Sequence, residues 1–115
     1  MKKRIIVANH SHSNQIVNLR RKSYHSSANF KIKNETEFEN YCQWSRKEET
    51  GIVLVALNEE DEAVSTLRAN VYFDSAEHEN SNLTFTGYTK DFIAYPTLDI
   101  SFAATLPGYA NQGFF

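Results

Sequence analysis

Two β-rich runs joined by a short acidic turn dominate the middle of the chain, in the stretch GIVLVALNEEDEAVSTLRANVYF. Runs of this kind predict an antiparallel hairpin with strands at Ile52–Leu57 and Val64–Phe73. The first run is apolar on both faces, so we expect it in the interior of a sheet. Glu59–Glu62 is most simply a solvated hairpin turn.

A strand and a helix are predicted before this hairpin. The β-branched run Arg4–Asn9 predicts the strand. The segment Gln15–Ser27 follows several potential N-cap residues, contains no Gly or Pro, and carries apolar residues at helical spacing. Its basic cluster, Arg20–Lys22, could meet a phosphate, but we interpret it as a solvated helix face.

A second helix is predicted over Asn34–Glu49. Thr36 precedes Glu39 by three residues, which is the capping-box arrangement. Gly51 then fits a stop at the C-terminal end of this helix.

The segment after the hairpin is polar at first and then β-rich again, with a last strand predicted from about Leu98 to Leu106. The order of strand, two helices and several strands predicts one α/β or α+β domain. We expect a mainly antiparallel sheet with both helices packed on it. A chain of 115 residues is one domain at most, here 1–115.

The composition excludes some classes of function. A net charge of −2 gives no general attraction to nucleic acid, and no apolar run is long enough to span a bilayer. Cys42 is the single cysteine, so a reducing cytoplasm is expected, and its position on an apolar helix side predicts burial rather than nucleophilic chemistry. His10 and His12 could share a metal, but they have no acidic or cysteine neighbour at ligand spacing. Solvated histidines are therefore expected, and no metal site.

The ending, SFAATLPGYANQGFF, is the remaining candidate for a site. A strand followed by Pro, Gly, a polar pair and Gly can present consecutive backbone N–H groups to a phosphate. This works best when a helix begins immediately afterwards and adds its free N–H groups.

Three segments together resemble the N-terminal half of the GNAT (Gcn5-related N-acetyltransferase) fold. LRRKSY resembles the start of the branch that contains N-acyl amino acid synthases and autoinducer synthases. The hairpin, with Thr66-Leu67-Arg68, resembles the second and third GNAT strands. LDISFAATLPGYANQGFF resembles the fourth strand and the acyl-CoA loop, with Pro107 and Tyr109 at the usual Pro-x-Tyr exit.

The resemblance implies transfer of an acyl group from acyl-CoA, acetyl-CoA or an acyl carrier protein to a small amine. It implies that Asp99 accepts a proton during this reaction and that the backbone of strand and loop binds the co-substrate. The thioester would lie along Ala103, Ala104, Thr105 and Leu106, and the pyrophosphate along Gly108, Tyr109, Ala110, Asn111, Gln112 and Gly113.

The ending departs from the GNAT loop in two positions. Ala110 stands where the loop usually has Arg or Gln, and Phe115 where it has Gly or Ala. The expected helix, fifth strand and remaining C-terminal half of the fold do not follow. Phe114 and Phe115 would each forgo about 1.5–3 kcal/mol of burial if they stayed in water.

We therefore expect no catalytic monomer from this chain alone. Either a longer chain completes the fold, or a second copy pairs with the open sheet edge and the terminal aromatic residues to form a homodimer. The alternative function is a non-catalytic binding or assembly module that dimerises through this edge.

Overall fold

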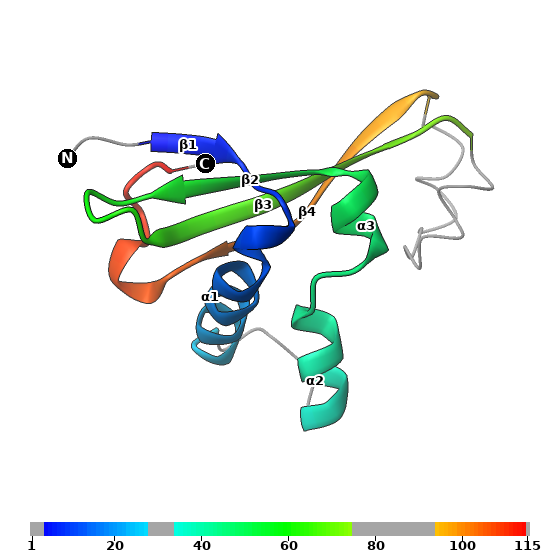
Figure 1. The fold of residues 1–115 in the computed structure, drawn as a ribbon. Helices are drawn as coiled ribbons and strands as arrows, with labels where there is room; N and C mark the ends of the chain where they lie inside the picture. The colour runs from blue at the N-terminus through cyan, green and yellow to red at the C-terminus, as the bar shows by residue number, and fades with distance from the viewer. Residues whose placement is uncertain (1–3, 28–33, 75–93, 115) are drawn as a thin grey trace.

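The computed structural model describes residues 4–27, 34–74 and 94–114. These ranges contain four strands, three α-helices and two short 3-10 helices. Figure 1 shows how the labelled strands and helices are arranged. In chain order they are β1 (Arg4–Val7), η1 (His10–His12), α1 (Ser13–His25), α2 (Glu35–Cys42), α3 (Arg46–Thr50), β2 (Ile52–Leu57), β3 (Ala63–Tyr72), β4 (Thr97–Thr105) and η2 (Pro107–Tyr109).

The strands form one antiparallel sheet in the order β1-β2-β3-β4. The predicted hairpin is confirmed, because β2 pairs with β3 from Ile52 opposite Ala69 to Leu57 opposite Ala63. The first strand of this hairpin was expected in the interior of the sheet, and this is confirmed as well, since β2 lies between β1 and β3. β4 matches the predicted last strand to within one residue at each end.

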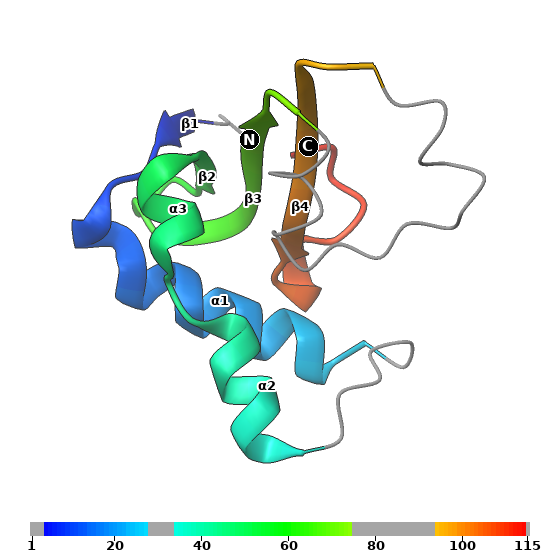
Figure 2. The ribbon, with the colours of Figure 1, turned by 90° about the vertical axis from the view of Figure 1, so that its right-hand side faces the viewer.

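The helices lie on one side of this sheet, and α2 projects away from it (Figures 1 and 2). Alternate residues of β2 face α1, and Ile16 packs against Val53, Val55 and Leu57 in the main core cluster. The final segment after β4 runs to the opposite face of the sheet from α1 (Figure 1). The helices thus cover one face, and the chain leaves β4 toward the other.

The predicted second helix is wrong in one respect: the segment forms two helices. Asn34, not Thr36, is the N-cap of α2, because its side chain accepts hydrogen bonds from two free backbone N–H groups of the first turn. The helix ends at Cys42, and a separate capping box begins α3, in which Ser45 and Glu48 satisfy each other's backbone donors. Glu48 is thereby fixed at the start of a short helix.

The remaining predicted strand and polar loop between residues 75 and 93 lie outside the described residues. Within the described ranges, no helix is both long and apolar enough to cross a membrane.

Candidate functional site

A bulge interrupts the pairing of β3 with β4. Thr66 lies opposite Ala104 and Arg68 opposite Ser101, so one residue of β3 faces two residues of β4, Phe102 and Ala103. Phe102 has a φ of 52°, in the left-handed region that bulky residues rarely adopt. Such a backbone conformation costs about 1–3 kcal/mol and occurs where the surroundings enforce it, often at functional sites.

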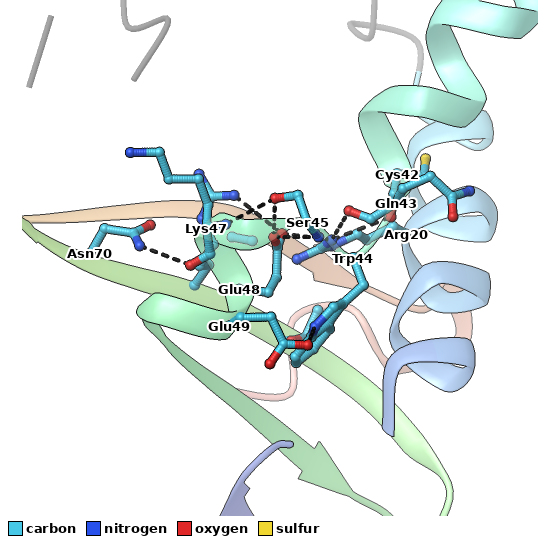
Figure 3. A network of polar contacts seen from close by, with 12 residues as sticks. Arg20, Cys42, Gln43, Trp44, Ser45, Lys47, Glu48, Glu49 and Asn70 are labelled. Atoms are coloured by element: carbon cyan, nitrogen blue, oxygen red, sulfur yellow. Dashed lines mark hydrogen bonds and ion pairs between the residues drawn. The ribbon is translucent and has the colours of Figure 1, made fainter. Parts of the chain in front are cut away.

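Buried charges lie beneath this bulge. Arg20 of α1 is completely buried, so its predicted place on a solvated helix face is wrong. Its Nη1 lies 3.1 Å from Oε1 of Glu48, and Nη1 of Arg68 lies 3.1 Å from the same oxygen. Figure 3 shows Arg20 and Glu48 meeting between α1 and α3. One carboxylate therefore joins α1, α3 and β3.

The polypeptide around α3 completes this network. Arg20 Nη1 also donates to the carbonyl oxygens of Cys42 and Gln43, each at 3.2 Å. The other carboxylate oxygen of Glu48 accepts from the backbone N–H and the hydroxyl of Ser45. Burial alone would raise the pKa of Glu48, but the Ser45 hydrogen bonds and the two guanidinium groups outweigh it and hold this pKa below its usual value.

The guanidinium groups are only partly satisfied. Among the described residues, Nε and Nη2 of Arg20 and Nε of Arg68 are buried without a hydrogen-bond partner. The Phe102 ring lies over both groups, with its centroid 4.9 Å from Cζ of Arg20 and 4.4 Å from Cζ of Arg68. Each such cation–π contact contributes about 0.5–2 kcal/mol. These contacts offset the backbone strain at Phe102.

The outer edge of β4 meets α1 next to the bulge. The Tyr24 hydroxyl donates to the Ala103 carbonyl at 3.4 Å, and the Thr105 N–H donates to the Ser23 hydroxyl at 3.3 Å. Burial raises the pKa of Tyr24 still further above neutral pH. Both contacts are long, so a ligand that offers better partners could displace them.

The segment after β4 forms a pocket rather than a helix N-terminus. Pro107–Tyr109 makes one 3-10 turn, and the chain then turns with a positive φ at Asn111 and at Gly113. A pocket of about 360 Å³ opens here. It is lined by Thr105, Tyr109, Asn111, Gln112, Gly113 and Phe114. The structure thus brings five of the residues predicted to bind the co-substrate around one cavity.

Phe114 corrects the expectation that a longer chain or a second copy is needed to bury the terminal aromatic residues. Its side chain is 6% exposed and packs against Ala56 and Val64 on the sheet face opposite α1. The Tyr109 ring meets it edge-on, with the centroids 6.1 Å apart. Folding of this chain alone therefore buries Phe114, without a second copy, while Phe115 lies outside the described residues.

The other predicted site residues lie along β4 and its exit. Asp99 is half-buried opposite Asn70, on the sheet face that carries Arg68. Ala103 is exposed at the bulge, Ala104 is buried and Leu106 is half-buried. Gly108 and Ala110 are exposed and do not line the pocket formed by their neighbours.

The remaining candidates for chemistry have ordinary surroundings. Cys42 is fully buried as predicted, and burial raises the pKa of its thiol. His10 lies 2.8 Å from a carboxylate oxygen of Glu49, and His12 accepts from the Asn9 N–H. No group of three potential metal ligands converges in the part of the chain that the structure describes.

Known proteins were compared at the level of sequence and of fold. No protein-family model and no curated protein sequence matches the chain. Among solved structures, the aminoglycoside antibiotic 6'-N-acetyltransferase AAC(6')-Ih from Acinetobacter baumannii matches with a TM-score of 0.58 at 12% sequence identity. That protein has the GNAT fold. The present chain has a partial GNAT-like fold.

The match covers 97% of this chain but 63% of the acetyltransferase chain. At this identity the similarity concerns the fold. The GNAT-like sheet and helices therefore agree with the architecture expected from the sequence, and the chain spans less than two thirds of the matched structure.

The Arg20–Glu48–Arg68 cluster was missed by the sequence reasoning. Ser45 and Glu48 stand three residues apart, which is a capping-box signal equal to the one assigned to Thr36. The Ser45–Glu48 spacing by itself predicts Glu48 in the first turn of a helix. Its approach to two arginines from distant segments depends on tertiary packing, which spacing along the chain does not reveal.

Proposed function

We propose that this chain is the co-substrate-binding part of an acyltransferase that moves an acyl group from acyl-CoA, acetyl-CoA or an acyl carrier protein to a small amine. The observation that carries the proposal is the combination of a GNAT-like fold with a bulged β4 whose exit loop lines a pocket. The buried single cysteine is compatible with a reducing cytoplasm, where acyl-CoA is available.

The proposed donor site follows β4 from the bulge to the loop. The thioester carbonyl would accept the Thr105 N–H in place of the Ser23 hydroxyl, since an aligned N–H polarises a carbonyl as negative charge develops on its oxygen. The pyrophosphate would lie against the backbone between Gly108 and Gly113. Asp99, half-buried on β4, lies six residues before Thr105, up to about 20 Å along the strand, so a chain of waters would have to carry the proton that the amine releases to it. The thiolate that leaves the donor would take up a proton from solvent.

Calorimetric titration tests the proposal. The folded chain is titrated with acetyl-CoA, a long-chain acyl-CoA and, separately, acetyl-pantetheine, which lacks the pyrophosphate. We expect heat from at least one CoA ester and weaker binding of acetyl-pantetheine, because the loop contacts are then missing. No heat from either CoA ester, with circular dichroism showing a folded protein, would refute the donor site for this chain.

A second candidate function is assembly with another copy of this chain. Val71, Leu98 and Ile100 share the sheet face opposite the helices and are 45%, 55% and 61% exposed. Neighbouring exposed apolar side chains of this kind favour association. Sedimentation velocity over a range of concentrations separates the candidates: a monomer at high concentration contradicts assembly and leaves the acyltransferase proposal standing.

A further inference from the structure

We propose that Arg20 and Arg68 form a binding site for a carboxylate group and that the Phe102 side chain is its lid. The buried charges give the first reason. The described residues bury three ionic side chains, those of Arg20, Glu48 and Arg68. Within this buried group two cations face one anion, so a monoanion would neutralise it; Asp99 on the same sheet face is only half-buried and lies outside this count.

The hydrogen-bonding groups give the second reason. Glu48 and two backbone carbonyls all use the same nitrogen of Arg20, Nη1. This leaves Nε and Nη2, the two N–H groups on one side of the guanidinium, without partners among the described residues. Adjacent N–H groups in this fork match the two oxygens of a carboxylate, and Nε of Arg68 offers a further donor.

Phe102 gives the third reason, because its ring occupies the space above both guanidinium groups. A phenyl ring attracts a cation but cannot replace an anion as a hydrogen-bond acceptor. Its backbone is held in the left-handed region within a bulge. The ring also packs against Tyr41, which is 38% exposed, so this aromatic pair separates the arginines from solvent.

These features favour a small, planar, singly charged ligand. Rotation of Phe102 out of the bulge vacates the volume of one ring, which suits a carboxylate better than a bulky phosphate ester. The carboxylate could belong to the amine acceptor or to a separate ligand. The site itself does not depend on acyl transfer, and a failure to bind CoA would leave it unaffected.

NMR of the arginine Nε–H groups tests the proposal directly. The folded chain is titrated with sodium acetate at constant ionic strength and with acetamide, its neutral analogue. We expect saturable shifts of the Arg20 and Arg68 Nε–H signals with acetate and none with acetamide. Equal responses to the two compounds, or no response to acetate, would overturn the proposal. The acetate titration is then repeated in the presence of a candidate acceptor amine that carries a carboxylate and of the same amine without it. Competition with acetate by the carboxylate-bearing amine alone would assign the bound carboxylate to the acceptor.

Three variants sharpen the test. Arg68→Met leaves Arg20 and Glu48 as a neutral pair, so it should fold and bind acetate about tenfold more weakly or worse. Phe102→Gly relieves the positive φ and removes the lid, so acetate should bind several-fold more tightly. Arg21→Met is the matched control on the same helix, because Arg21 pairs with Glu39 at the surface, and it should bind acetate like the unmodified chain. Unchanged acetate affinity in Arg68→Met would contradict the site.

Discussion

Replacement of Glu48 by Gln perturbs the structure at the point where three elements meet. The substitution keeps the shape of the side chain but removes the negative charge that faces Arg20 and Arg68. Removing one partner of a buried ion pair costs about 3–5 kcal/mol, because the opposite charge stays buried without compensation. The Gln amide also cannot reproduce both oxygens, so the capping box with Ser45 weakens as well. Against a typical stability of about 5–15 kcal/mol, a loss of this size is a large fraction of the total.

Urea unfolding followed by circular dichroism and by the fluorescence of Trp44, the single tryptophan, measures the loss. The matched control is Glu49→Gln, one residue further along α3. Its carboxylate is half-exposed and contacts His10 and Trp44 at the surface, so its midpoint should stay close to that of the unmodified chain. Equal midpoints for Glu48→Gln and Glu49→Gln would refute the reasoning, because the buried cluster would then contribute nothing specific.

The same carboxylate should make the fold sensitive to acid. Since the pKa of Glu48 is lower in the folded state than in the unfolded chain, its contribution is fully present above the ordinary Glu value of about 4.3. It is lost as the pH falls through the folded-state pKa. Urea midpoints measured from neutral pH down to about pH 3 should therefore fall less steeply for Glu48→Gln than for the unmodified chain. Parallel curves for the two proteins would contradict this assignment.

Three other substitutions or reactions test the packing. Gly51→Ala should destabilise the chain by about 1–3 kcal/mol in urea unfolding, because the added Cβ would lie 2.7 Å from the backbone oxygen of Ala69; an unchanged midpoint would contradict this contact. Phe114→Ala should lower the free energy of unfolding by about 3–5 kcal/mol in urea unfolding, since the ring is buried against the sheet. An almost unchanged midpoint would show that Phe114 lies at the surface. The thiol of Cys42 should react with a disulfide reagent only as fast as the chain unfolds, and rapid reaction in the native state would show that it is accessible.

Local patterns predicted the strands of the described residues and the first helix well, because their signals are short-range. The acidic turn joins β2 to β3, and the continuous apolar run of β2 reflects burial on both faces except at Ile52, which is exposed at the start of the strand. The division of the second helix was not predicted, since Asn34 and Ser45 compete with Thr36 as N-caps and only packing decides among them. Three-residue spacing alone could not rank these caps.

The candidate site likewise has a part that was predicted from the sequence and a part that was not. The loop after β4 was recognised from its Pro, Gly and polar residues, and the structure gathers several of them around one pocket. The buried status of Arg20 could not be read from a basic cluster, because its partner Glu48 is distant in sequence and is positioned by its own capping box. Phe102 gave no signal either, since a bulge with a positive φ depends on the register of two strands.

A backbone amide NMR titration with acetyl-CoA tests the central proposal most directly. If this GNAT-like chain binds the co-substrate along β4, the amide signals of Thr105 and of residues 108–114 should shift in a saturable manner, while those of α2 stay in place. Saturable shifts elsewhere without any at β4 and its exit loop, or no shifts at all from a folded protein, would contradict the account.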